Sequence, residues 1–168
     1  YADIARLFGW QALKNFWYQE NLDYNAGLLT CFEKPICRDG LSQTDSRILR
    51  LSKAAKADLT PLIQFWGVHP DNSTVLSEAV TAAGLDKSTT IRDKLIYYAS
   101  IAPDNNSEFN EHFNTVFPDS KVSDCESQDY GCGWYHAWSD NFTSSHGDKI
   151  TSRIQSLLNQ YFPGTNLP

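Results

Sequence analysis

The feature that most constrains the fold of this chain is the spacing of its apolar residues, which recur three and four positions apart in one segment after another. In the first such segment these residues are Ile4, Leu7, Phe8, Ala12, Leu13, Phe16 and Trp17. This spacing is typical of a helix with one wide apolar face. It predicts a single N-terminal helix that fades near Asn21 to Asn25, with Asp3 capping its start.

A second helix is predicted to begin at Ser42 or Thr44. A D-L-T-P run then starts a new helix, because Pro is tolerated at the first helical position and Asp58 or Thr60 can accept hydrogen bonds from the exposed amides. Gly67 is expected to cap the end of this short helix.

Further helices are expected over residues 73–83, 90–101, 106–117 and 145–161. Alternating apolar residues, which would predict strands, do not occur over any length. The predicted fold class is therefore all-α, an irregular bundle of about six to seven helices. We expect one helical domain over residues 1–168, since a chain of this length can bury a substantial core.

The four cysteines fall into two close pairs, Cys31 with Cys37 and Cys125 with Cys132. Neither spacing is the C-x-x-C of a zinc ribbon or a redox motif. Turn residues lie within both intervals, so two short disulfide-closed loops are predicted, which indicates an oxidising compartment outside the cytoplasm. Four buried free thiols, and disulfides between the two pairs, are alternatives that the spacing leaves open.

The charge of the chain disfavours a nucleic-acid partner. The sequence has 20 acidic against 14 basic residues, a net charge of −6, and its basic residues are scattered. Such a surface repels phosphate backbones.

No apolar run approaches the roughly 20 residues that span a bilayer. An apolar helical pattern is already running by Ile4 with no signal peptide before it, so we expect the sequence to be part of a longer protein.

The sequence contains no complete catalytic motif. The H-E-x-x-H pattern, which brings two imidazoles of a zinc peptidase to one metal, is absent. Glu108 and His112 are one helical turn apart, but one Glu and one His are too few for a closed zinc site, and a solvated helix face is the preferred interpretation. We therefore predict no catalytic residue, no metal ligand and no cofactor within this sequence.

The best local candidate for a ligand-binding surface is an aromatic segment that precedes the last predicted helix. Its members are Tyr130, Trp134, Tyr135 and Trp138. Rings of this kind stack on sugars or on peptide side chains. The interpretation that we prefer is that they fill the core beside the second cysteine pair, because large aromatic side chains dominate core burial.

Two segments resemble a known protein family. The first contains, in order, Leu7-Phe8-Gly9-Trp10, Asp45-Ser46-Arg47, Leu51-Ser52-Lys53-Ala54, Asp58-Leu59-Thr60-Pro61-Leu62 and Phe65-Trp66-Gly67-Val68. The second contains Leu95-Ile96-Tyr97-Tyr98 and Pro103-Asp104-Asn105-Asn106-Ser107-Glu108-Phe109. Together they are similar to the region downstream of the zinc site in M60-like, enhancin-related zinc metallopeptidases. The likeness covers roughly residues 1–117 and is nearest to secreted bacterial mucin-degrading members, which include accessory colonization factor D-type lipoproteins.

The resemblance implies a parent enzyme in which two His and a downstream Glu hold Zn²⁺ and the Glu of H-E-x-x-H activates water. It also implies mucins and other O-glycosylated proteins as substrates, a secreted or bacterial cell-surface location, and a role in colonization and virulence. None of the zinc ligands has a counterpart here, so no catalytic role passes to any position. The chain is expected to be the helical C-terminal portion, with the catalytic portion and the glycoprotein substrate as partners. The alternatives are a helical module that binds glycans or host proteins, and a purely structural cap.

Overall fold

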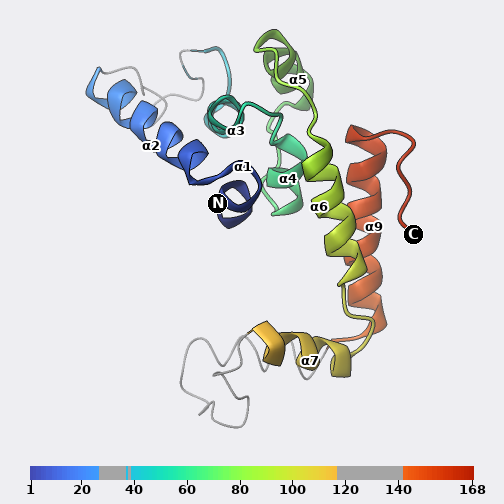
Figure 1. Ribbon diagram of the computed structural model, residues 1–168. Coiled ribbons are helices and arrows are strands. Elements are labelled where there is room, and N and C mark those ends of the chain that lie inside the picture. The colour runs from blue at the N-terminus through green and yellow to red at the C-terminus, as the bar shows by residue number, and fades with distance from the viewer. Residues whose placement is uncertain (27–36, 38, 117–141) are drawn as a thin grey trace. The chain divides into compact units, whose positions relative to one another are not determined.

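The computed structural model describes residues 1–26, 37, 39–116 and 142–168 (Figure 1). Within these ranges the chain forms eight helices and no strand, which confirms the all-α class and shows that the predicted count of six to seven is too low. The helices are α1 (Ala2–Phe8), α2 (Trp10–Asn25), α3 (Gln43–Ala55), α4 (Thr60–Phe65), α5 (Ser73–Ala82), α6 (Thr89–Ser100), α7 (Asn106–Val116) and α9 (Ser144–Tyr161).

The predicted N-terminal helix is in fact two helices, which adds one to the count. The break is at Gly9, whose φ of +79° and ψ of 157° belong to a region that is nearly restricted to glycine. The predicted cap at Asp3 is also wrong. Tyr1 is the N-cap of α1 and its side chain makes no capping bond, whereas the Asp3 carboxylate is buried and accepts a hydrogen bond from Trp66 Nε1–H at 2.9 Å.

The structure divides into two compact units. The first comprises residues 1–95 and 157–166, and the second comprises residues 96–156 and 167–168. Helices α6 and α9 contribute residues to both units. The expectation of a single domain over residues 1–168 stays a prediction.

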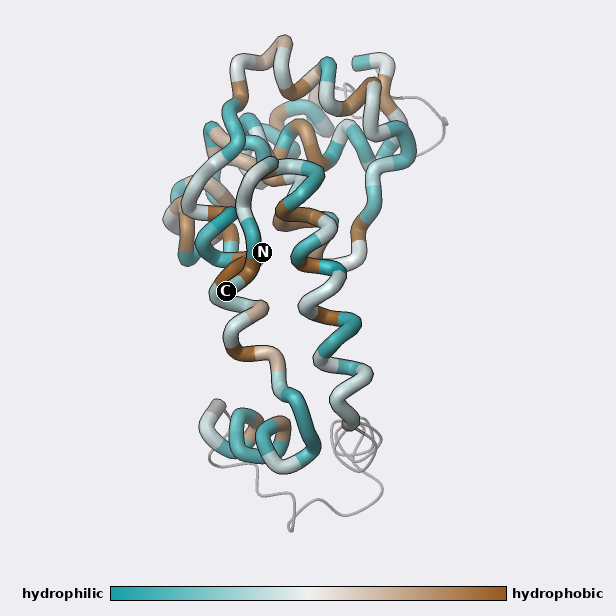
Figure 2. The backbone as a smooth tube through the Cα atoms, turned by 90° about the vertical axis from the view of Figure 1, so that its right-hand side faces the viewer, coloured by the Kyte–Doolittle hydropathy of each residue, from teal (hydrophilic) through white to brown (hydrophobic). Residues whose placement is uncertain are grey.

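Helix α3 lies at the centre of the first unit. Figure 1 shows it almost end-on, with α2 on one side and α5 on the other, and it packs against α2, α4 and α5. Apolar residues recur between hydrophilic ones along the helical segments of the chain, as Figure 2 shows. The side chains that form the core between α3 and α5 are Leu41, Ile48, Leu49, Leu76 and Val80.

A buried carboxylate on α3 holds the chain where it enters α5. Ser42 Oγ accepts a hydrogen bond from the Asp45 amide at 3.1 Å, which confirms Ser42 as the cap of α3. The Asp45 carboxylate is 1% exposed and accepts hydrogen bonds from the backbone amides of Asp71 and Asn72, both at 2.9 Å. Each of these acceptors satisfies an amide that has no partner within a helix.

Helix α4 begins and ends where the sequence predicts. Asp58 Oδ1 accepts a hydrogen bond from the Thr60 amide at 2.9 Å, so Asp58 rather than Thr60 supplies the side-chain acceptor. The Oγ atom of Ser52, on α3, accepts a hydrogen bond from the Leu59 amide at 3.1 Å. Gly67 follows the helix with φ +88°, which confirms it as the glycine that closes α4.

The second unit contains the end of α6, all of α7 and most of α9. The rings of Phe109 and Phe142 stack with their centroids 4.9 Å apart. A Cβ atom at Gly147 would lie 2.4 Å from the Pro103 carbonyl oxygen, so the backbones approach closely at this point. Helix α7 has no buried residue over positions 106–115.

Cys37 is the one cysteine among the described residues. It is 6% exposed and is disulfide-bonded. Cys31, Cys125 and Cys132 lie outside the described residues, so the two predicted disulfide-closed loops stay a prediction.

Candidate functional site

The four aromatic residues that the sequence singles out as a ligand surface lie outside the described residues. They are Tyr130, Trp134, Tyr135 and Trp138. Both interpretations of this segment, a binding surface and a filled core, stay predictions.

Within the described ranges, no group of three or more His, Cys, Asp or Glu side chains is arranged to hold a metal ion. Glu108 accepts hydrogen bonds from the Asp104 amide at 3.0 Å and from Asn105 Nδ2 at 2.8 Å, while Asn105 Oδ1 accepts from the Glu108 amide at 3.0 Å. Asn105 and Glu108 therefore stabilise the start of α7 through reciprocal hydrogen bonds that resemble a capping box. His146 has a similar role in α9, where its Nδ1 accepts from the Thr143 amide at 3.0 Å.

The first unit contains a groove of about 720 Å³ where residues of α1, α2, α3 and α4 meet. A groove of this volume lies within the usual range for small-ligand sites. Its apolar and aromatic lining residues are Tyr1, Ile4, Trp17, Ile48, Leu51, Leu62, Ile63, Trp66 and Val68. Its polar and charged lining residues are Asp3, Glu20, Gln43, Thr44, Arg47 and Arg50.

Three aromatic rings of the groove are at least half exposed. The exposed fractions are 53% for Tyr1, 52% for Trp17 and 59% for Trp66. The apolar spacing predicts that Trp17 shares the apolar face of the first helix with Phe16, and this prediction is wrong for Trp17. Successive residues are about 100° apart around a helix, so Phe16 enters the core, at 2% exposure, and Trp17 turns toward the groove.

Three side-chain contacts orient the rings of the groove. The indole of Trp66 is fixed at its N–H by the buried Asp3 carboxylate, and its ring meets that of Phe65 edge-on at 5.0 Å. The ring of Trp17 lies 5.9 Å from that of Tyr1. These contacts favour particular orientations of the rings that line the groove.

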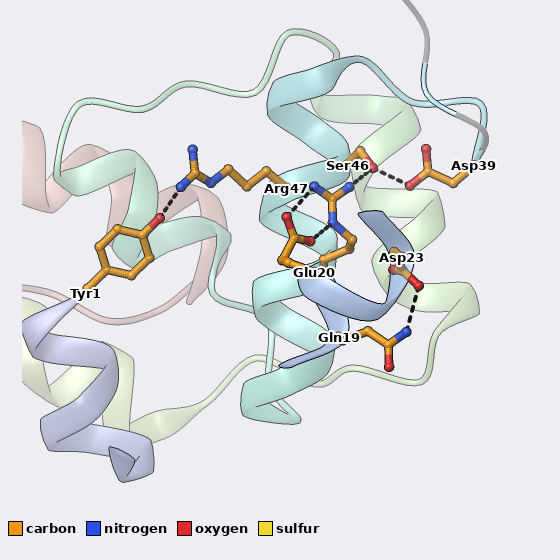
Figure 3. A network of polar contacts seen from close by, with 8 residues as sticks. Tyr1, Gln19, Glu20, Asp23, Asp39, Ser46 and Arg47 are labelled. Atoms are coloured by element: carbon orange, nitrogen blue, oxygen red, sulfur yellow. Dashed lines mark hydrogen bonds and ion pairs between the residues drawn. The ribbon is translucent and has the colours of Figure 1, made fainter. Parts of the chain in front are cut away.

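Two arginines on α3, three residues apart, have different partners (Figure 3). Arg50 forms an ion pair with Glu20 of α2 and donates a further hydrogen bond from Nη1 to Ser46 Oγ. Ser46 in turn donates to Asp39 Oδ2 at 2.6 Å. This network ties α2 to α3 along one side of the groove.

Arg47 is exposed and extends toward Tyr1, as Figure 3 shows. One Nη2–H group of Arg47 donates to the Tyr1 hydroxyl, and the guanidinium carbon lies 5.9 Å from the centroid of the Tyr1 ring. No carboxylate in the described part of the chain pairs with Arg47. The two carboxylates of the groove, by contrast, each have a partner of their own, since Glu20 meets Arg50 and Asp3 accepts from an indole.

The arrangement is suited to binding. Rigid aromatic faces, an aliphatic floor and an exposed guanidinium are the features of a recognition site. No sequence pattern predicts this groove, although several of its residues belong to the predicted helices and to the segments that carry the resemblance. One sequence signal nevertheless pointed to the groove. Trp66 stands directly before the glycine that closes α4, and a side chain at a helix end does not have to face the core.

No family model, curated protein or solved structure matches the chain. In the part of the chain that the structure describes, none of the helices combines the length and the apolar character needed to cross a membrane. The resemblance to M60-like metallopeptidases therefore stays a prediction from the residues.

Proposed function

We propose that this chain is the helical, non-catalytic C-terminal portion of a secreted zinc metallopeptidase of the M60-like kind that acts on mucin-like O-glycoproteins. The observation that supports the proposal is an overlap. Residues that carry the resemblance also line the groove, namely Arg47, Leu51, Leu62, Trp66 and Val68. Arg47, Trp66 and Val68 are exposed there, which a purely architectural role does not require.

Under this proposal Zn²⁺ is bound by residues of the parent protein that lie outside this chain. The chain would contact the catalytic portion of the same protein. The groove would then contact the glycoprotein substrate. The two predicted disulfide-closed loops belong to the same proposal, and the disulfide at Cys37 suits a secreted or cell-surface location.

The coding sequence upstream of Tyr1 tests the family assignment. We expect H-E-x-x-H within about a hundred residues, followed by a further Glu ligand, because a gluzincin site needs all three side chains. A parent gene without this motif would contradict the proposal.

Two assays on the chain itself test its role. With added zinc, the chain is expected not to cleave mucin or casein. Cleavage that a chelator abolishes would contradict the proposal that the chain is non-catalytic.

Binding of the chain to immobilised mucin is expected to weaken in the variant Trp17→Ala. Trp10→Ala is the matched control, since Trp10 lies on the same helix, is 69% exposed and does not line the groove.

A helical module that binds glycans or host proteins is the second candidate. The three exposed rings of the groove favour it, because they can stack on sugars or side chains whether or not a zinc site is attached. Mucin binding that depends on Trp17, combined with an upstream sequence lacking H-E-x-x-H, would select this candidate over the first.

A further inference from the structure

We propose that the groove binds a small amphiphilic carboxylate, a ligand with an apolar alkyl or aromatic body and one carboxylate at its end. Arg47 would hold the carboxylate, and the aliphatic and aromatic lining would cover the body. The inference rests on the recognition groove of the proposed function and is independent of the zinc-peptidase assignment.

The charges of the groove select an anion. Four charged side chains line it, and Glu20 and Arg50 neutralise each other. Asp3 is 5% exposed and faces the Trp66 indole N–H. Arg47 is exposed, and its contact with the Tyr1 hydroxyl occupies one of its five N–H donors. The remaining donors have the fork geometry that matches a carboxylate.

The order of lining residues along α3 gives the ligand a direction. Polar side chains come first, at Gln43, Thr44 and Arg47. Ile48 and Leu51 follow, together with Arg50, whose charge is paired with Glu20. Residues three and four apart lie on one face of a helix, so this face changes from polar to apolar along its length. A ligand with its carboxylate beside Arg47 therefore lays its body along the apolar end.

The floor of the groove, unlike the exposed rings at its sides, disfavours sugar hydroxyls. Ile48, Leu51 and Leu62 are buried side chains at 2%, 6% and 1% exposure, and none carries a hydrogen-bonding group. Sugar hydroxyls placed against them would lose water without gaining a partner, which is costly. An alkyl or aromatic body loses nothing there and gains the hydrophobic contribution of burial.

The rings at the sides of the groove are organised before any ligand arrives. Asp3 fixes the Trp66 indole, and the Arg50–Glu20 pair ties α3 to the helix that carries Trp17. Because these side chains are already ordered, binding of a ligand loses little conformational entropy in the groove. Its volume of about 720 Å³ is ample for a body of eight to ten carbon atoms.

Matched ligands test the proposal on the intact chain at pH 7. The probes are octanoate, 1-octanol and octylammonium, studied by titration calorimetry and by the NMR shifts of indole N–H groups assigned with Trp17→Phe and Trp66→Phe. We expect octanoate to bind about tenfold more tightly than 1-octanol, octylammonium to bind more weakly than either, and both groove indoles to shift. Equal binding of the three probes, or shifts that avoid Trp17 and Trp66, would overturn the proposal.

The variant Arg47→Gln tests the carboxylate contact. Octanoate affinity is expected to fall about tenfold, to the level of 1-octanol, while 1-octanol binding stays unchanged. Arg6→Gln is the matched control, because Arg6 is an exposed arginine of α1 that does not line the groove. Both positions are exposed, and melting curves followed by circular dichroism verify that both variants fold. Unchanged octanoate affinity in Arg47→Gln would overturn the proposal.

A third experiment, which compares octanoate with an acidic sugar and with mucin, distinguishes this inference from the proposed function. If 3′-sialyllactose, a sugar that carries a carboxylate, binds more tightly than octanoate and through Arg47, the ligand is an acidic glycan and the amphiphile is excluded. Octanoate binding together with no mucin binding would support this inference and contradict the glycoprotein role. Mucin binding that Trp17→Ala weakens, without octanoate binding, would do the reverse.

Discussion

At the scale of single residues, buried polar side chains fix the backbone on either side of α4. Asp45 and Ser52 of α3, and Asp58 in the turn before α4, are all at most 6% exposed, and each accepts at least one hydrogen bond from a backbone amide. Removing such an acceptor leaves amides without a partner, which costs more than the bond itself contributes. These side chains thus set how the chain enters α4 and α5.

Asp45→Ala is expected to lower the free energy of unfolding by about 2–4 kcal/mol, because two amides lose a charged acceptor in a buried position. Urea denaturation measures the change. Asp86→Ala is the control, since the Asp86 side chain is exposed, and its effect is expected to stay below about 0.5 kcal/mol. A loss at Asp45 no larger than that of the control would contradict the capping role.

Tyr161 predicts a dependence of stability on alkaline pH. Its hydroxyl donates to Gln64 Oε1 at 2.8 Å, and burial, with the nearby Asp58 carboxylate, raises the pKa of Tyr161 to about 12 from 10.0. Between these two values the unfolded chain releases the phenolic proton and the folded chain keeps it. The unfolded state then binds fewer protons, so this contribution to stability is full below pH 10 and is lost as the pH rises toward 12.

Tyr161→Phe removes this titration. Urea denaturation between pH 8 and pH 11.5 is expected to show a shallower loss of stability in the variant, because other alkaline titrations are common to both proteins. At neutral pH the variant is expected to be less stable by about 0.5–1.5 kcal/mol, since the bond to Gln64 is lost. Parallel pH profiles would show that Tyr161 titrates normally.

At the scale of helices and turns, local signals predicted the start of α3 and the end of α4 correctly, but not the cap of α1. The capping serine of α3 and the closing glycine of α4 are found as expected, because each acts within a few residues of itself. The division at Gly9 was missed, since a glycine within an apolar helical pattern is compatible with a continuous helix. Trp17 was assigned to the core because periodicity alone does not decide which edge of a wide apolar face stays exposed.

Gly9→Ala tests the division between α1 and α2. The φ of +79° with ψ of 157° is strained for any residue with a Cβ atom, although no atom lies within 4 Å of the site that a Cβ would take. A stability loss of about 1–3 kcal/mol is therefore expected from backbone strain alone. Thermal melting measures it, with Lys14→Ala on the exposed side of α2 as the control for a harmless change. An unchanged melting temperature in Gly9→Ala would show that the two helices join with little strain.

At the scale of the whole molecule, the groove had no local signature in the sequence. Its lining extends from Tyr1 to Val68 and becomes a site only when four helices meet. The sequence around Arg47 and Arg50 does not indicate which of the two arginines forms an ion pair and which stays exposed. The difference between them is that Glu20, on another helix, pairs with Arg50 and leaves Arg47 exposed. Fold class follows from short-range periodicity, whereas a groove depends on contacts between residues that are far apart in the chain.

The unequal burial of the helices predicts how the molecule opens. Helices α5 and α7 have similar lengths, 10 and 11 residues. In α5, Leu76 and Val80 are buried against α3, whereas α7 has no buried residue over 106–115. Segments with few buried apolar contacts open at low free energy. Native-state hydrogen exchange is therefore expected to show slow exchange in α3 and α5 and fast exchange in α7.

The variant Leu76→Ala makes the exchange experiment decisive. It removes a side chain that is 1% exposed and is expected to lower the free energy of opening for the amides of α3 and α5 by about 2–4 kcal/mol. The amides of α7 are expected to keep their rates, because they already open by local fluctuation that does not involve this core. Exchange in α7 that is as slow as in α5, or that accelerates equally in Leu76→Ala, would show that α7 opens only with the core between α3 and α5.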